Sequence, residues 1–165
     1  MDAEARTAPI SHCETVQDAW VDYNGHMNVA YYVLVFDHAT DGLLDAIGLD
    51  AAGREACGGS VFVVEAHVTY ENEVLAGDAV EVETRVLDVD DKRIHLFHRM
   101  FRPDDEHATV ATNELMIVYV DMVTRRTAAM PVEVRARLRE LKAGAEHLPR
   151  PTQAGRAIAI RRRAD

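Results

Sequence analysis

One short loop gathers the residue types that could do chemistry. Residues 20–28 read Trp-Val-Asp-Tyr-Asn-Gly-His-Met-Asn, which places a carboxylate at Asp22 and an imidazole at His26 on either side of Gly25. A carboxylate can activate water or act as a nucleophile, and an imidazole can hydrogen-bond to a carbonyl group. The same residue types also build ordinary loops, in which Asp22 caps a turn and Asn24 or Asn28 caps a helix.

A long apolar helix is expected directly after this loop. Asn28 suits the N-cap position and Gly48 the C-cap position. Between them, helical spacing relates Val29, Val33, Phe36, Thr40, Leu43 and Ile47. A helix that is apolar nearly all round must be buried nearly all round, and its wet stripe is limited to Asp37, Asp41 and Asp45. Its N-terminus would offer unpaired N–H groups and the positive end of a dipole beside Asp22.

The rest of the chain reads mainly as strands. Alternating or apolar segments predict strands at residues 10–16, 60–71, 80–86, 93–102 and 109–121, and helical spacing predicts a second helix at 132–143. On the second strand, one face is expected to carry Phe62, Val64, Ala66, Val68 and Tyr70. A strand, a buried helix and four hairpin-joined strands predict an α+β fold, with one antiparallel sheet wrapped around a central helix.

Composition limits the classes of function. The 165 residues are 48% hydrophobic and 28% charged, which is typical of one globular domain, and the net charge of -10 argues against nucleic acid and anionic membranes as partners. Two cysteines and no Cys/His spacing typical of zinc sites predict neither a disulfide framework nor a metal site. No apolar segment is long enough to span a bilayer and residues 1–12 lack a signal-peptide core, so the cytoplasm is the expected location.

We expect a single domain over residues 1–148 and a flexible tail over 149–165. The tail contains Pro149, Pro151 and Gly155 and ends in three arginines, Arg161, Arg162 and Arg163. Such a cluster could bind nucleic acid, but in an acidic chain it is more typical of a solvated terminus. The sheet would leave an edge and a far face uncovered, which predicts a homodimer with a continuous sheet, or a homotetramer.

The loop from Asp22 to Asn28, with a helix opening after it, resembles the signature loop of hotdog-fold thioesterases of the 4-hydroxybenzoyl-CoA type. Those enzymes typically show Asp, two variable residues, Gly, His, an aliphatic residue and Asn. The resemblance covers about residues 10–145. Within the family, the segments 64–67 and 92–98 and the Tyr31–Tyr32 pair look most like betainyl-CoA thioesterases of carnitine degradation, some of which are fused to carnitine dehydrogenase.

This resemblance implies an acyl-CoA thioesterase that needs no cofactor, with betainyl-CoA as the leading substrate. It places the catalytic carboxylate at Asp22, as nucleophile or general base, and the substrate carbonyl at the start of the helix. His26 either donates a hydrogen bond to that carbonyl or braces the loop, and bracing is favoured because this His looks structural in related enzymes. Asn28 has the same two roles open to it, and Gly25 completes the signature.

Substrate contacts follow from aromatic and charged residues. Trp20, Tyr23 and Tyr31 lie at the loop or the first helical turn and could cage a trimethylammonium group, whereas Tyr32 and Phe36 are expected in the core. Glu65 stands in an otherwise apolar strand with His67 two residues on, so the pair either forms a subunit contact or belongs to the site. Strand-end cations could bind the CoA phosphates, or could simply be solvated; these are Lys92, Arg93, Arg125 and Arg126.

Two other functions are compatible with a hotdog fold. Hotdog hydratases and dehydratases carry Asp-x-Asn with a His five residues after the Asp, whereas here His26 comes four residues after Asp22 and Gly25 replaces their usual Pro. A non-catalytic acyl-CoA-binding protein would be expected to lack the Asp, and Asp22 is present. Both alternatives are therefore disfavoured.

Overall fold

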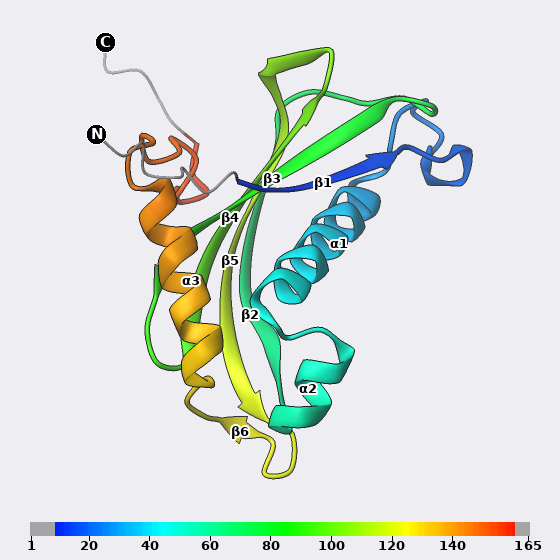
Figure 1. The fold of residues 1–165 in the computed structure, drawn as a ribbon. Coiled ribbons are helices and arrows are strands. Elements are labelled where there is room, and N and C mark those ends of the chain that lie inside the picture. The colour runs from blue at the N-terminus through cyan, green and yellow to red at the C-terminus, as the bar shows by residue number, and fades with distance from the viewer. Residues whose placement is uncertain (1–8, 161–165) are drawn as a thin grey trace.

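The computed structural model describes residues 9–160. An antiparallel sheet curls around a long central helix (Figure 1), which confirms the predicted α+β hotdog fold. Its strands are β1 (Ile10–Thr15), β2 (Gly59–Tyr70), β3 (Ala79–Val89), β4 (Arg93–Arg102), β5 (Asp105–Asp121) and β6 (Arg126–Thr127). The helices are η1 (Asp18–Trp20), α1 (Val29–Ile47), α2 (Ala51–Cys57) and α3 (Val132–Ala145).

The strand order corrects one prediction. The five long strands run β1-β3-β4-β5-β2, so β2 pairs with β5 at one edge and does not form a hairpin with β3. The intervening segment 71–78 is too long for a tight hairpin, and it is fixed at the start of α1 by buried Val74, whose carbonyl accepts from Met27 N at 2.9 Å. The chain therefore crosses from one side of the sheet to the other next to the candidate loop.

Helix α1 forms where the sequence predicts it. The Asn28 side chain accepts a hydrogen bond from Ala30 N at 3.0 Å, and Gly48 ends the helix with φ 83° in the left-handed region. The wet stripe is confirmed, because Asp37, Asp41 and Asp45 are exposed. The helix is less completely covered than expected, since Val29 and Val33 remain 55% and 44% exposed.

Two core clusters hold α1 against the sheet. The first half of the helix packs with Val74, Val80 and Met100, and the second half packs with β4, β5 and α3. The predicted second helix is confirmed as α3, whose Val134 and Leu138 are buried in the second cluster. Because α1 packs against the core along its length, the end of the loop that joins the helix has a fixed position.

A bulge in β2 makes the predicted single apolar face wrong. The pairing with β5 shifts register between Val63 and Glu65, and Val61 and Val68 both pack against the core although they differ in parity. Phe62 therefore lies on the opposite face from Val68 and Tyr70. Sequence alternation alone does not show where an extra residue enters a strand.

The first part of the C-terminal segment lies against the sheet. Arg85 Nη1 donates to Pro149 O at 3.3 Å, and Gly155 N donates to Glu114 Oε2 at 2.7 Å. Residues 149–155 thus run over the face opposite α1, whereas residues 156–160 are exposed. The three terminal arginines and the first eight residues lie outside the described residues. Within the described range 9–160, no helix has the length and hydrophobicity needed to cross a membrane.

Candidate active site

Asp22 is fixed by hydrogen bonds to both carboxylate oxygens. Asn24 N donates to Oδ1 at 2.8 Å, and Asn28 Nδ2 donates to Oδ2 at 2.9 Å. The pKa of Asp22 lies below its ordinary value, chiefly because of the Asn24 backbone N–H and then the Asn28 side chain. The carboxylate is therefore ionised at neutral pH, and its orientation is set within the loop itself.

The loop backbone closes on itself around Gly25. Asp22 N donates to His26 O at 3.2 Å, Gly25 N donates to Asp22 O at 2.9 Å, and Val21 bridges to Met27. Gly25 has φ 84°, a conformation that residues with a Cβ rarely adopt. His26 Nδ1 lies 3.2 Å from Met27 O, which agrees with a bracing role for this imidazole.

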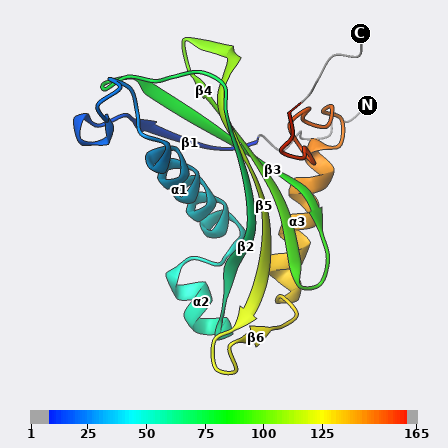
Figure 2. The ribbon, with the colours of Figure 1, turned by 180° about the vertical axis from the view of Figure 1, so that it is seen from behind.

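Two further bonds attach the loop to its surroundings. Asn28 N donates to Trp20 O at 2.9 Å, so the start of α1 is tied to the residue that opens the loop. Met27 is fully buried and reaches across to the β2–β3 connection through its bond to Val74 O. These contacts hold Asp22 beside the first turn of α1. The segment that leads into α1 lies at the end of the molecule away from β6 and α2 (Figures 1 and 2).

The start of α1 leaves a donor open at this site. Ala30 N is taken by the Asn28 side chain and Tyr31 N by Asn28 O. The N–H of Val29 donates to no other group in the described part of the chain. An open N–H at a helix N-terminus can polarise a carbonyl oxygen. Sequence reasoning identified the helix start, but the assignment of each amide needed the structure.

The aromatic candidates separate into buried and accessible residues. Trp20 is 6% exposed and stacks on Tyr31, with ring centroids 5.4 Å apart at 12°. Tyr23 is 96% exposed at the tip of the loop, and Tyr31 is half-buried. Tyr32 and Phe36 are in the core as predicted. Among these candidates, the rings that are open to a ligand within one chain are therefore those of Tyr23 and Tyr31.

Tyr70 is an aromatic residue at the site that sequence reasoning missed. It ends β2, packs edge-on against Tyr32 with centroids 5.3 Å apart, and its hydroxyl donates to Val29 O at 3.4 Å. Burial raises the pKa of Tyr70. The only sequence signal was its place at the end of an apolar strand, which does not indicate which helix turn it meets.

Glu65 and His67 are not brought to Asp22 within the chain. Both line a cavity of about 330 Å³ on the sheet face opposite α1, together with His95 and Glu114. His95 Nε2 and Glu114 Oε1 are 2.8 Å apart there. The prediction that Glu65 and His67 share a face is confirmed, whereas their substrate-binding role stays a prediction.

The candidate CoA cations lie at the far end of the sheet from Asp22. Lys92 and Arg93 line a groove of about 730 Å³, in which Arg93 pairs with Asp90 at 2.6 Å. Arg126 belongs to β6, and the Arg125 guanidinium lies 5.2 Å from the Phe62 ring centroid. A single chain therefore does not place these cations beside its own loop (Figure 1).

Comparison with known proteins identifies a family that matches this chain. A family model described as the Thioesterase-like superfamily matches residues 16–138, which include the loop, α1 and the whole of β2–β5. A Staphylococcus aureus protein solved in complex with CoA superposes with a TM-score of 0.88 at 30% identity, covering 93% of this chain and 96% of that one.

Two curated relatives are also similar. The betainyl-CoA thioesterase of Pseudomonas aeruginosa is 42% identical over 86% of this chain and 88% of its own length. The L-carnitine dehydrogenase/betainyl-CoA thioesterase of Agrobacterium fabrum is 46% identical over 89% of this chain. The matched region is 30% of that longer protein.

Proposed function

The chain belongs to the thioesterase-like superfamily, and from that membership we propose that it hydrolyses an acyl-CoA thioester at the loop before α1. The observation that carries the proposal is the ionised Asp22 carboxylate, which is hydrogen-bonded to Asn28, the N-cap of the helix whose first residue, Val29, has an open N–H. In the reaction, water adds to the thioester carbonyl carbon, the C–S bond breaks, and a carboxylate and the CoA thiol leave. CoA enters as part of the substrate, and the reaction uses no further cofactor.

On the electrophile side, the substrate carbonyl oxygen is expected to lie at the N-terminus of α1. Negative charge develops on this oxygen as the tetrahedral intermediate forms. The Val29 N–H would donate to it, and the dipole of a 19-residue helix favours negative charge at that end. Because the donor is backbone held by the Asn28 cap, it needs no rearrangement during the reaction.

On the nucleophile side, two routes use the same carboxylate. Asp22 could attack the carbonyl carbon and expel the CoA thiolate, giving a mixed anhydride that water then cleaves. Alternatively, Asp22 could take a proton from water as the water attacks. The low pKa of Asp22 keeps the carboxylate charged in either route, and its two hydrogen bonds leave lone pairs for the substrate or water.

The direct test is thiol release from purified protein. A panel of acyl-CoA esters is incubated with the enzyme, and the free thiol is followed with a disulfide reagent. Hydrolysis of one or more esters is expected. A hydratase would instead consume an enoyl-CoA without releasing thiol, and a binding protein would retain acyl-CoA unchanged, so either result would overturn the proposal.

The proposal includes a homodimer, alone or within a homotetramer, with a site built from two chains. Strand β2 is a sheet edge of 12 residues, and Val63 and Val64 on it are 49% and 59% exposed. Val29 and Val33 add exposed apolar surface at the start of α1. A long apolar edge of this kind is usually covered in the native assembly.

Antiparallel pairing of two β2 edges would also bring candidate CoA-binding cations of one subunit close to the candidate site of the other. The Tyr70 end of β2 contacts Val29, and the Gly59 end pairs with Asp121 beside Arg126. In such a pair, the Gly59 end of one subunit meets the Tyr70 end of the other. Arg125 and Arg126 of one chain would then approach the α1 N-terminus of its partner, where CoA phosphates could bind.

Light scattering and a paired substitution test this assembly. Val64→Lys puts a charge into the edge, whereas Val132→Lys changes a valine that is 64% exposed at the start of α3. We expect wild type and Val132→Lys to be dimers or tetramers, and Val64→Lys to dissociate and to lose at least about tenfold in kcat/KM. A fully active monomer would contradict the two-chain site.

For the acyl group, the proposal names betainyl-CoA. Two curated relatives carry this name, and the accessible faces of Tyr23 and Tyr31 suit a quaternary ammonium. Each cation–π contact contributes about 0.5–2 kcal/mol. The neutral comparison is 3,3-dimethylbutyryl-CoA, in which carbon replaces the nitrogen. We expect kcat/KM for betainyl-CoA to be higher by about tenfold to a few hundredfold.

Tyr23 offers a matched pair of variants for this test. Tyr23→Phe keeps the ring, and Tyr23→Leu removes it from a side chain that is exposed and outside the core. If the ratio of kcat/KM between betainyl-CoA and the neutral ester falls in Tyr23→Leu but not in Tyr23→Phe, a cation–π contact is supported. If wild type hydrolyses the neutral ester as well as betainyl-CoA, the cationic substrate is wrong, while the thioesterase proposal stands.

The cytoplasm is the proposed location. Cys13 and Cys57 are both free and exposed, as is usual for proteins of a reducing compartment. Acyl-CoA esters and their free thiol product are also compatible with such a compartment.

A further inference from the structure

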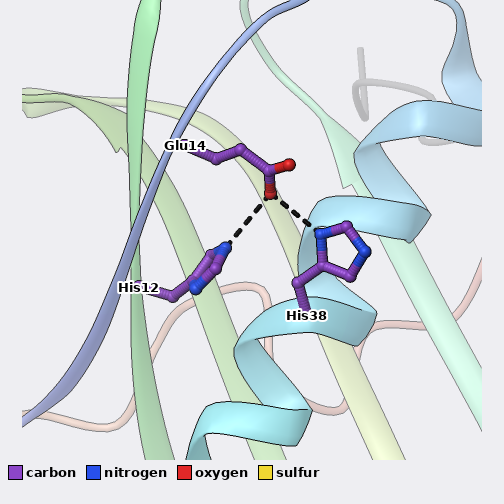
Figure 3. A group of neighbouring side chains, drawn as sticks. All are labelled: His12, Glu14 and His38. Atoms are coloured by element: carbon purple, nitrogen blue, oxygen red, sulfur yellow. Dashed lines mark hydrogen bonds and ion pairs between the residues drawn. The ribbon is translucent and has the colours of Figure 1, made fainter.

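Three side chains that the proposed reaction does not use meet between β1 and α1 (Figure 3). His12 Nε2 and His38 Nδ1 lie 3.1 Å and 3.0 Å from the same atom, Glu14 Oε2. The three potential ligand atoms all lie within 4.8 Å of one another. Figure 3 shows both imidazoles directed at the carboxylate, His12 from the strand and His38 from the helix.

The fold brings these residues together from separate elements. Along β1 the burial alternates, so His12 and Glu14 face the protein while Ser11, Cys13 and Thr15 are exposed. Helix α1 packs against β1 and presents His38 to them, 24 residues after Glu14. The absence of zinc-like spacing in the sequence therefore did not indicate the absence of a cluster.

The donor set matches a metal site. Two imidazole nitrogens and one carboxylate oxygen are a ligand set used for zinc and other divalent transition metals. Ligands about 2.0–2.2 Å from one ion stand about 2.8–3.1 Å from each other in octahedral geometry and about 3.3–3.6 Å in tetrahedral geometry. The two N–O separations of 3.1 Å and 3.0 Å therefore fit a shared ion with octahedral angles. The side chains are 29%, 18% and 38% exposed for His12, Glu14 and His38, which leaves an approach from solvent.

We propose that His12, Glu14 and His38 bind one divalent transition-metal ion per chain, with zinc as its representative. The three residues supply three ligands, and water completes the coordination. The ion joins edge strand β1 to the central helix, which closes a loop that contains the Asp22 segment. It takes no part in thioester hydrolysis, and the inference does not depend on the proposed function.

Calorimetry with zinc tests this site on untagged protein that has been treated with a chelator and dialysed. We expect saturable binding of about one equivalent by wild type. Glu14→Gln, His12→Gln and His38→Gln should each raise the dissociation constant for zinc by at least about tenfold, because each removes one of three ligands. The His12→Gln/His38→Gln double variant should show no saturable binding.

His107→Gln is the matched control, because it removes an exposed imidazole from the β4–β5 hairpin. It should bind zinc like wild type. Thermal unfolding with and without zinc provides a second readout: Tm should rise in wild type and His107→Gln and stay constant in the double variant. Circular dichroism of the metal-free proteins checks that each variant is folded.

Cobalt provides a spectroscopic check, since Co²⁺ bound by these side chains should give visible absorption that the double variant lacks. The proposal is wrong if wild type shows no saturable zinc binding. It is equally wrong if a folded double variant binds zinc with the wild-type affinity, because the ion would then lie elsewhere on the chain.

Discussion

Two regions of the molecule each hold a titratable group between two hydrogen-bonding partners: the Asp22 loop, and the protein interior between Thr40 of α1 and the sheet. At the loop, the group is a carboxylate whose partners, Asn24 and Asn28, are near it in sequence. In the interior, the group is the imidazole of His98, which bonds Thr40 Oγ1 and Thr84 Oγ1, each at 3.0 Å, across three different elements. The first arrangement keeps a charge accessible, and the second keeps a neutral group buried.

Helix α1 takes part in both arrangements: its N-cap Asn28 orients an accessible charge, and its Thr40 satisfies a buried neutral ring. His98 is fully buried, and burial lowers its pKa to about 3, so it is neutral at physiological pH. Asp22 has a low pKa for another reason, namely hydrogen bonds donated to its charged form. We therefore expect substitution of Asp22 to change turnover with little effect on stability, and substitution of His98 to do the reverse.

The largest effect is expected at Asp22. Asp22→Asn removes the charge and should lower kcat by at least about a hundredfold, the scale of a lost general base or nucleophile. The new amide would also face the Asn28 amide, so some loss could come from a disturbed loop. Near-normal turnover of a folded Asp22→Asn variant would refute the catalytic role.

The double variant Asp22→Asn/Asn28→Asp is the matched control. It exchanges the two side chains, so an amide can still donate to a carboxylate, and the carboxylate now at position 28 can still cap α1. Its stability should be close to that of wild type, and its turnover should remain as low as that of Asp22→Asn. Recovery of activity in the double variant would indicate that the charge, and not its position at residue 22, is what matters.

The interior counterpart is His98→Ala. This change removes a buried ring that stacks on Phe36 at 5.8 Å and bonds two threonines, and it should lower the free energy of unfolding by about 2–4 kcal/mol. Turnover per folded molecule should stay within about twofold of wild type. Urea unfolding and kcat measured at low temperature would check both parts, with exposed His107→Ala as the control.

A pH series sharpens the same contrast. His98 has a folded pKa of about 3 and an ordinary pKa of 6.5, so between these values the unfolded chain binds the extra proton. Stability should therefore fall as the pH falls below 6.5, by up to about 2 kcal/mol at pH 5 from this group. Urea unfolding of wild type and His98→Gln at pH 7 and pH 5 should show the smaller loss in His98→Gln, and equal losses would contradict the assignment.

The sequence predicted those parts of the fold whose contacts are local. The caps of α1, the limits of β4 and the Asp22 loop depend on neighbours in the chain, and the structure agrees with them. The pairing of β2 with β5 and the bulge after Val63 depend on distant partners, so alternation within a strand did not reveal them.

The same distinction holds for the candidate sites. Asp22 could be identified because a carboxylate before an apolar helix is visible in one stretch of residues. Glu65 and His67 had no such context, and the sheet places them on the face away from α1. To predict the His12–Glu14–His38 cluster, one must know which face of β1 points inward and which side of α1 packs against β1. No pattern in a single segment specifies both.

The smallest effect is expected at Asn28, where stability and chemistry meet. Asn28→Ala removes the N-cap of α1 and should cost about 1 kcal/mol of unfolding free energy. It also removes a donor that lowers the pKa of Asp22, so the acid limb of the kcat/KM profile should move to higher pH. Asp50→Ala is the matched control, because Asp50 caps α2 by accepting from Gly53 N at 2.7 Å and has no contact with Asp22. It should lose a similar amount of stability and keep the wild-type pH profile. If the two variants share one profile, the Asn28–Asp22 bond does not tune the carboxylate, and Asn28 is a helix cap only.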